Sequence, residues 1–579
     1  MHQATTTPHP SLYFDYQVHP AAALPAVDRV EPVLIVGGGP VGLTTALLLA
    51  RAGVRCVLLQ AEQQVCEGSR AVAFTRRSLE ILQQTGAHRV FDTMGLPWGC
   101  GNSHYRGQRV FRMETPHSPH ERFAPLNNLQ QQFVEQALLD EAAQQPLVEI
   151  RWGHKLVNVL QAGTVHAGAA QARTQGGTGD APAELEIDTP HGRYVQRAQF
   201  VVASDGARST LRSQLNLKLE GSSYEGRFVI ADIRIQLPLP TERLAFFDPV
   251  WNPGNTVLMH RQPLDMWRID YQLPPDETPE QALQPDSLKA RINAQLAMIG
   301  HAGVPWELDW SSVYSARALT LPDYRHGRVL FAGDAAHLLP IFGVRGANTA
   351  FQDAQNLAWK LALVARGQAP LALLDSYSHE RVAAAREIVF EAGKSTRFMT
   401  PPTPGFRLLR DAVLSLSLTQ AFVRPLYHWR TSRAHAYADS PLNASAVDTS
   451  ADDNAAFGAS GLAVGEPMAN VALAPGEFLM DHFPVGFLLL VVGRAPSNTM
   501  SADVENALSG FRASGHTISV QHSNHADVVA RYAGPQGRGL YLFRPDQHVC
   551  ARWLALDTRR LESALNRAIG FAQPQRDPP

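Results

Sequence analysis

Two glycine-containing motifs, almost 300 residues apart, constrain this chain more than any other feature of its sequence. The first, residues 33–43, reads Val-Leu-Ile-Val-Gly-Gly-Gly-Pro-Val-Gly-Leu. It predicts a buried strand, a tight turn and the start of a helix, which together open a βαβ unit and imply a parallel sheet. Such a turn lets backbone N–H groups and a helix N-terminus approach a pyrophosphate. The predicted contact residues are Gly37, Gly39, Pro40, Val41 and Gly42.

The second motif, residues 327–337, reads Gly-Arg-Val-Leu-Phe-Ala-Gly-Asp-Ala-Ala-His. It predicts a buried strand over residues 328–332 that ends in Gly333-Asp334. A carboxylate at a strand end can hold a ribityl or ribose hydroxyl. Either motif alone is a weak signal, but the pair predicts bound FAD, and nothing in the sequence implies a covalent link to the flavin.

Two more strand ends carry residues that suit the same cofactor. Asp205-Gly206 follows a predicted buried strand over residues 198–203. An acidic residue that binds the adenosine ribose normally lies about 20 residues past the glycine turn. Here that position is Gln60, eighteen residues after Gly42. Glutamine can accept from one ribose hydroxyl, but without the assistance of a charge.

A predicted helix over residues 346–366 follows the second motif. Its N-terminus would present the N–H groups of Gly346, Ala347 and Asn348, just beyond Gly343, and would stabilise negative charge on a reduced flavin ring. His337 could be mistaken for a base, and we favour a structural role for it beside the flavin.

Composition excludes several other classes of function. The chain has 579 residues, enough for about three domains, with 45% hydrophobic and 18% charged residues. A net charge of −2 argues neither for nucleic acid nor for an anionic membrane. The four cysteines have no C-x-x-C spacing, so we expect neither a metal site nor a disulfide framework, and a cytoplasmic location fits. The N-terminus lacks a signal-peptide pattern, and the apolar runs are too short to span a bilayer.

The substrate pocket is expected in the strand-rich middle of the chain. Residues 256–262 and 266–272 predict a β-hairpin that turns at Leu264-Asp265. Pairing residue 262 with residue 267 would place mostly apolar side chains on one face, with His260, Gln262 and Tyr271 as polar groups. An apolar wall with a few polar groups suits a phenol. The alternative, that His260 and Tyr271 are ordinary core residues, stays open. The same pairing would send Met259, Arg261, Arg268 and Asp270 to the opposite face.

These motifs, with the segment 348–360 (Asn-Thr-Ala-Phe-Gln-Asp-Ala-Gln-Asn-Leu-Ala-Trp-Lys), resemble those of the class A flavoprotein aromatic hydroxylases, which have the p-hydroxybenzoate hydroxylase fold. The similarity is strongest to the longer phenolic hydroxylases, such as 3-(3-hydroxyphenyl)propionate hydroxylase and pentachlorophenol monooxygenase. The resemblance implies an α/β fold with a C-terminal thioredoxin-like domain. The expected organisation is an N-terminal arm (1–30), a Rossmann-like FAD-binding domain (31–435) interleaved with a β-rich substrate domain (roughly 100–130 and 215–310), a linker (436–459) and the C-terminal domain (460–579).

The resemblance also implies roles for individual residues. Arg70 and Gln131 should contact FAD, Asp205 should serve both FAD and its reduction, and Pro340 should lie near the oxygen-reacting edge of the flavin. NADH or NADPH would reduce FAD, O2 would add at flavin C4a, and the hydroperoxide would hydroxylate a phenolic ring. The chain departs from the family at Gln60, where an acid is usual, and at Gly343-Val344, where two glycines are common.

Three other functions are alternatives to a hydroxylase. A flavin halogenase is disfavoured because the Trp-x-Trp-x-Ile-Pro signature is missing, with Trp306 and Trp310 wrongly spaced. A flavin-bound accessory protein that sequesters a reactive aromatic ligand, and an oxidative dehalogenase or denitrase of a substituted phenol, both stay open. The C-terminal domain has one cysteine, Cys550, so we expect it to be structural rather than redox-active. A homodimer is compatible with the sequence.

Overall fold

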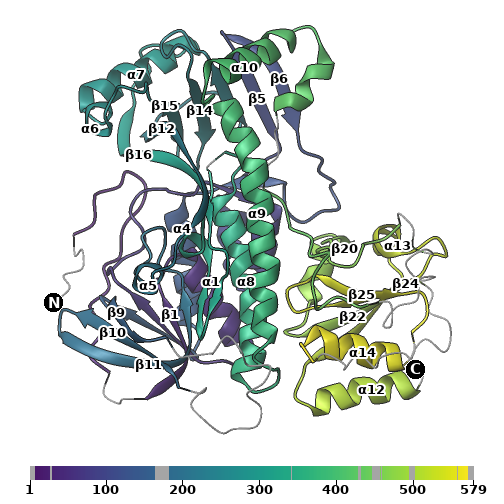
Figure 1. Ribbon diagram of the computed structural model, residues 1–579. Helices are drawn as coiled ribbons and strands as arrows, with labels where there is room; N and C mark the ends of the chain where they lie inside the picture. Colours follow the sequence, from purple (N-terminus) through teal and green to yellow (C-terminus); the bar gives the residue numbers. More distant parts are fainter. Residues whose placement is uncertain are drawn as a thin grey trace.

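The computed structural model describes residues 7–25, 29–162, 181–340, 342–427, 432–445, 457, 460–493, 502–556 and 558–571. Two large sheets lie one above the other, two long helices run along one side of them, and a smaller unit packs against those helices (Figure 1). Among the described residues, no helix is long and apolar enough to cross a membrane.

The first sheet contains the predicted parallel core. Strands β18, β11, β1 and β2 lie in that order and run parallel, with β8 beyond β2 and the short β17 at the other edge. Strands β2 and β18 and the last four residues of β1 and β11 are almost fully buried, so these segments are continuous apolar runs rather than alternating ones. The bounds are β1 Val30–Val36, β2 Cys56–Gln60, β8 Val148–Trp152, β11 Gly192–Ala203, β17 Arg325–His326 and β18 Val329–Phe331.

An antiparallel pair extends this sheet. Strands β9 (Lys155–Gln161) and β10 (Ala183–Thr189) pair with each other, and β10 pairs with β11. Strands β9 and β10 form a hairpin, and residues 163–180 between them lie outside the described residues.

Four helices accompany the first sheet. They are α1 Pro40–Arg51, α2 Arg76–Gln83, α4 Gln131–Ala143 and the short α5 Thr210–Gln214. Pro40 suits the first turn of α1, because that position needs no N–H donor.

The second sheet has eight strands in the order β19-β16-β12-β15-β14-β13-β5-β6. Their bounds are β5 Cys100–Tyr105, β6 Gln108–Glu114, β12 Glu220–Arg234, β13 Arg243–Phe247, β14 Thr256–Arg261, β15 Met266–Gln272, β16 Glu307–Thr320 and β19 His337–Leu338. One face packs on α7 (Pro285–Met298) through an apolar cluster that includes Met259, Trp267 and Ile292. We call the opposite face, which carries His260 and Arg268, the inner face.

The β14–β15 hairpin forms where the sequence predicts it, but the predicted register is wrong by one residue. His260 pairs with Arg268, and the Gln262 N–H donates to the Met266 carbonyl at 2.8 Å. The loop holds three residues, 263–265, and both Leu264 and Asp265 have positive φ. A shift of one residue moves every side chain of a strand to the other face.

Helix α8 (Gly346–Ala365) runs beside the first sheet, the longer α9 (Leu373–Met399) runs beside both sheets, and α10 (Pro404–Leu416) caps the end of the second sheet (Figure 1). Most of α8 is buried, because it packs against α1 on one side and α9 on the other. Helix α9 contacts β16 of the second sheet and β17 of the first, so it ties the two sheets into one body.

The N-terminal arm lies on this body through several anchors. Phe14 is buried, and its ring lies 5.1 Å from that of Phe133 in α4. The Ser11 hydroxyl donates to Asp309 in β16 at 2.9 Å. The arm thus bridges the first sheet's helices and the second sheet.

The C-terminal unit is built on a four-stranded sheet in the order β23-β22-β24-β25. Strand β22 is parallel to β23 and antiparallel to β24, and β24 is antiparallel to β25. Helices α12 and α14 contact each other, while α13 contacts β22. The bounds are β22 Phe487–Val492, α12 Ala502–Ala513, β23 Ile518–Ser523, α13 Ala526–Tyr532, β24 Gly539–Phe543, β25 Val549–Trp553 and α14 Thr558–Ala568.

The expected linker lies mostly outside the described residues, but its first part is well packed. Tyr437 and Leu442 are buried, and the Tyr437 hydroxyl accepts from Arg381 of α9 at 3.0 Å. Residues 432–445 therefore follow the surface of the body rather than spanning a gap.

Candidate active site

The predicted cofactor residues converge at one edge of the first sheet. Because β18, β11, β1 and β2 are parallel neighbours, their carboxyl ends present Asp334, Asp205, Gly37 and Gln60 side by side. Ligands of open α/β sheets bind at this edge.

The three glycines of the turn differ in what they require. A Cβ on Gly37, which has φ +108°, would lie 2.3 Å from the Ser204 carbonyl oxygen, and one on Gly42 would lie 2.0 Å from the Gly37 oxygen. Neither position has room for a side chain. A Cβ on Gly39 would meet nothing within 4 Å, although Gly39 is the N-cap of α1. The backbone is therefore open at Gly39, where a phosphate would approach the helix.

Gln60 faces the glycine turn. Its Oε1 accepts from the Gly38 N–H at 3.2 Å. Gln60 thereby holds the turn itself, and this contact uses one of the acceptor sites that a ribose hydroxyl would need.

Asp205 ends β11 and caps the short helix after it. Its Oδ2 accepts from the Leu211 N–H at 3.1 Å, while Oδ1 is buried without a hydrogen-bond partner among the described residues. Burial raises the pKa of Asp205, opposed by the hydrogen bond from Ser209. The Arg212 guanidinium donates to the Ala335 carbonyl at 2.9 Å and so joins this turn to the Gly333-Asp334 turn. Gly206, next in the chain, has φ +77° and open space where a Cβ would lie.

Asp334 is the one exposed side chain in the buried run 331–340. The surrounding protein nevertheless raises its pKa, against the nearby His337, Arg70 and Arg212 side chains. The Asp334 carboxylate thus lies deep in the fold and is still open to a ligand. Gly333 has φ +61°, and a Cβ there would lie 3.0 Å from Val41 of α1.

His337 is held by a buried ionic cluster that sequence reasoning missed. Its Nε2 lies 2.7 Å from Asp353 Oδ2, which also accepts from the Gly333 N–H at 3.0 Å. Arg381 Nε donates to Asp353 Oδ1 at 2.6 Å. Burial alone would raise the pKa of Asp353, but Arg381 and His337 hold it below its ordinary value. This geometry agrees with the structural role expected for His337.

Helix α8 begins at Gly346, and no side chain among the described residues caps it. Asn348 is turned away from the helix end: its Oδ1 accepts from the Thr75 N–H at 2.8 Å and from the Ser78 hydroxyl at 2.6 Å. The backbone N–H groups of Gly346, Ala347 and Asn348 lie in the first turn, where a helix leaves such groups without intrahelical partners.

The loop before α8 carries a strained residue. Gly343 has φ +89° and Val344 has φ +54°, a conformation that β-branched residues rarely adopt. Val344 packs against Trp98 and Leu126. The chain therefore has at position 344 the positive φ that a glycine adopts easily, together with an apolar side chain. Pro340, expected near the flavin's reactive edge, is buried at the start of this loop.

Arg70 and Gln131 lie at the other side of the site. The Arg70 side chain is exposed and close enough to Asp334 to oppose the shift in its pKa. Gln131 is engaged within the protein: its Oε1 accepts from the Ala71 N–H at 2.9 Å, and its Nε2 donates to Glu135 at 2.7 Å. Gln131 therefore supports the loop that carries Arg70.

The inner face of the second sheet adds a row of polar side chains beside that loop. Asp232 of β12 accepts from Gln262 at 2.7 Å and forms an ion pair with Arg268 at 2.8 Å. Arg268 also donates to the backbone carbonyls of Ser69 and Arg70. Burial, Arg243 and Arg268 lower the pKa of His260 to about 3. His260 and Gln262 share this face with Asp232, Arg268 and Asp270. The predicted register placed Arg268 and Asp270 on the opposite face, and no sequence motif marks Asp232.

Tyr271 is not part of this group. It lies on the opposite face, where it belongs to the apolar cluster against α7, and its ring lies 5.7 Å from that of Trp251. Tyr271 lies on that face because the loop of the hairpin sets a register one residue away from the predicted pairing of 262 with 267. Arg261 shares that face and donates to the Leu239 carbonyl at 2.8 Å.

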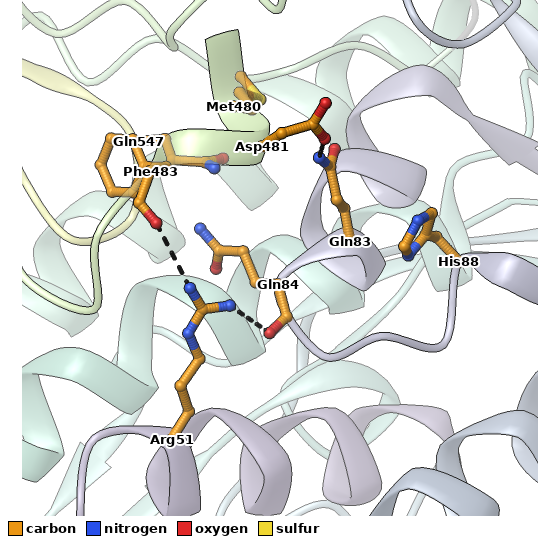
Figure 2. A pocket seen from close by; sticks show the side chains of 8 residues that line it. All are labelled: Arg51, Gln83, Gln84, His88, Met480, Asp481, Phe483 and Gln547. Carbon is orange, nitrogen blue, oxygen red and sulfur yellow. Dashed lines mark hydrogen bonds between the residues drawn. The ribbon is translucent and has the colours of Figure 1, made fainter. Parts of the chain in front are cut away.

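A cavity of about 180 Å³ lies elsewhere, between α2 and the C-terminal unit (Figure 2). Arg51 spans it, donating to the backbone carbonyls of Gln84 and Phe483. Gln83 donates to Asp481 at its rim. The cavity is lined by residues at and after the ends of α1 and α2 and by residues of the C-terminal unit, so it belongs to the seam between the two units.

The residues at the sheet edge fit FAD on their own geometry. Open space at Gly39 and the uncapped start of α8 suit a pyrophosphate and an electron-rich ring, respectively. The Asp205 Oδ1, which has no hydrogen-bond partner in the described parts of the chain, and the exposed Asp334 carboxylate suit hydroxyl groups.

Comparison with known proteins agrees with this geometry. The family model described as "FAD binding domain" matches residues 31–392, so the chain belongs to that family. The prediction of FAD as cofactor is thereby confirmed. Among curated relatives, 3-(3-hydroxy-phenyl)propionate/3-hydroxycinnamic acid hydroxylases are 29% identical in Comamonas testosteroni and 30% identical in Klebsiella pneumoniae (strain 342). The matches cover 66% and 67% of this chain and 61% and 66% of those proteins. They bear out the resemblance found in the sequence.

Solved structures show the same fold over nearly the whole chain. A flavin-dependent monooxygenase, PieE, in complex with FAD and substrate has a TM-score of 0.76 at 22% identity and covers 94% of this chain and 100% of its own. An aklavinone-11 hydroxylase with FAD and aklavinone has a TM-score of 0.71 at 24% identity, covering 94% and 99%. Because the identity is low, these likenesses establish the fold and nothing finer.

Proposed function

We propose that this chain is a FAD-dependent monooxygenase that uses NADH or NADPH and O2 to hydroxylate a phenolic ring. The curated relatives are hydroxylases of hydroxyphenyl compounds, and the matches span three fifths to two thirds of their length. The observation that carries the proposal is the position of the inner face. Its polar row, anchored by Arg268 to the carbonyls of Ser69 and Arg70, adjoins the loop expected to contact the flavin.

The roles of the residues follow from their places. Gly37, Gly39 and Gly42 would admit the pyrophosphate, and Asp334 and Asp205 would hold hydroxyl groups. Bound FAD would supply electron transfer from NAD(P)H and activation of O2. The chain's own part is to bind the ring, orient its hydroxyl and exclude water.

The inner face suits an aromatic substrate because it joins apolar and polar parts. Phe228, Leu258 and Phe342 belong to one apolar cluster, and His260 and the Asp232–Arg268 pair lie in the next row of the sheet. A planar ring would lie against the first group and direct its hydroxyl toward the second. We propose in addition that the C-terminal unit is thioredoxin-like and structural, supported by its β23-β22-β24-β25 order and its single cysteine.

The test is a panel of phenols, with and without a carboxylate side chain, scored by NAD(P)H oxidation, H2O2 and product mass. We expect at least one phenol to accelerate NAD(P)H oxidation and to gain 16 mass units, the mass of one oxygen atom. Acceleration that yields H2O2 alone with every phenol would favour an accessory protein or another substrate class. Loss of a halide or nitro group would favour the dehalogenase or denitrase alternative.

A further inference from the structure

Asp270 occupies the middle of the inner face, although no sequence motif marks it. In β15 the residues Arg268, Asp270 and Gln272 alternate on this face. Across the sheet, Asp270 is paired with Ile230 of β12 and Leu258 of β14. Its own row is thus apolar on both sides.

Two contacts place this row relative to the predicted flavin site. One row away, Arg268 donates to the Ser69 and Arg70 carbonyls. One row away in the other direction, Phe228 lies across from Gln272, and its ring lies 5.2 Å from that of Phe342, in the loop before α8. Alternate residues of a strand are about 7 Å apart. Asp270 therefore lies between the two loops that border the expected flavin ring.

The Asp270 carboxyl is buried and incompletely satisfied. Its residue is 5% exposed, and Oδ1 has no hydrogen-bond partner among the described residues. A buried acceptor without a donor is costly, and its persistence in a well-packed face needs an explanation. The charged groups that act on it are Arg268 and Arg243, which favour its ionised form, and Asp232, which opposes it. Burial outweighs them and raises the pKa of Asp270 to about 7.

We propose that Asp270 is the base that accepts the proton of the substrate's phenolic hydroxyl. The proposal rests on the proposed function. In this step the substrate O–H bond breaks, a new O–H bond forms at Asp270 Oδ1, and the electron pair stays on the phenolic oxygen. The charge thus moves from the carboxylate to the phenolate and stays within reach of the Arg243 and Arg268 guanidinium groups. The ionised ring is the better nucleophile.

His260 is a weaker candidate for this role. It lies in the neighbouring row, opposite Arg268, and two arginines act on it. A group that protonates at a pH of about 3 has little affinity for the proton of a phenol, whereas a base poised near neutral pH is effective. His260 can still orient the ring or its hydroxyl, because its Nδ1 has no hydrogen-bond partner in the described part of the chain.

The test compares Asp270→Asn with Asp265→Asn in the FAD-loaded enzyme. Asp265 lies exposed in the loop of the same hairpin, so it is a matched change outside the site. The substrate is a phenol that wild-type enzyme hydroxylates and whose own pKa is about 10. We expect Asp270→Asn to lower kcat/KM for hydroxylation at pH 8 on the order of 100-fold or more, the range for general-base catalysis. FAD binding and ligand binding, read from the flavin's visible spectrum, should stay within about threefold, and Asp265→Asn should match wild type.

A second readout uses the wild-type protein alone and does not depend on the variant folding. Ultraviolet difference spectra at pH 8 should show the bound phenol as phenolate, although the free phenol is neutral at that pH. Hydroxylation by Asp270→Asn within threefold of wild type, or a bound phenol that stays neutral in wild type, would overturn the assignment. If no phenol stimulates wild-type turnover, the proposed function fails instead, so the two failures are distinguishable.

Discussion

Replacing Glu380 should expose how firmly the C-terminal unit is held to the rest of the chain. Glu380 of α9 is buried and accepts from Arg544 at 2.6 and 3.1 Å, from Lys360 at 2.7 Å and from Asn356 at 2.6 Å. Arg544 belongs to the C-terminal unit and also pairs with Asp546 at 2.6 Å. Two cations and two carboxylates thus balance inside the protein.

Glu380→Gln keeps the shape of this side chain but leaves one positive charge in excess among the buried groups. Breaking a buried pair by removing one partner costs about 3–5 kcal/mol. We therefore expect the free energy of unfolding, from reversible urea denaturation followed by circular dichroism, to fall by that amount. The control is Glu505→Gln, because Glu505 pairs with Arg512 at 2.9 Å with both side chains largely exposed. Such surface pairs contribute about 0–1 kcal/mol. Equal losses in the two variants would refute the idea that this network holds the interface.

Four further predictions follow from the same structure. Gly39→Ala should fold normally, because its Cβ meets only open space, but should bind FAD weakly, because that space is where the pyrophosphate is expected. Gly42→Ala should fail to fold, because its Cβ would overlap the Gly37 carbonyl oxygen. Melting curves and FAD content of the two variants test this prediction, and equal behaviour would contradict it. Gln60→Glu should tighten FAD by up to about 1 kcal/mol through a charge-assisted hydrogen bond, and an unchanged Kd would show that this side chain does not reach the ribose. Cys550→Ser should leave turnover within about twofold, a barrier change below ~0.5 kcal/mol, and a large loss at an unchanged melting temperature would make the C-terminal unit catalytic. Arg544 and Lys360 lower the pKa of Glu380, so the ionised carboxylate stabilises the fold above about pH 4, and this stabilisation is lost as the pH falls toward the lowered pKa. The Glu380→Gln variant should therefore lose less stability in acid than wild type.

Local sequence patterns were enough to predict the first sheet and its ligand-binding edge. The apolar runs before Gly37, Asp205 and Asp334 mark buried parallel strands, and a parallel sheet brings their ends together without further information. The long helix after Gly346 follows from the same reasoning, since its start is tied to the second glycine motif.

The inner face could not be predicted in the same way, because strand register depends on loop geometry. The alternation of side chains correctly separates the two faces within each strand. The loop, in which Leu264 and Asp265 have positive φ, determines which face of β14 lies on the same side of the sheet as a given face of β15. The predicted register therefore places Tyr271 on the wrong face and excludes Asp270 from the inner face. Long-range contacts such as His337–Asp353–Arg381 join residues from three separate segments, and no local pattern indicates them.

The most direct test of the central claim is hydroxylation under an atmosphere of oxygen-18. The FAD-loaded enzyme, NAD(P)H and the best phenol of the panel are mixed under labelled O2, and the product is analysed by mass spectrometry. The account predicts that one labelled oxygen atom appears in the new hydroxyl group. An unlabelled hydroxyl, with its oxygen drawn from water, or labelled H2O2 without any hydroxylated product, would contradict it.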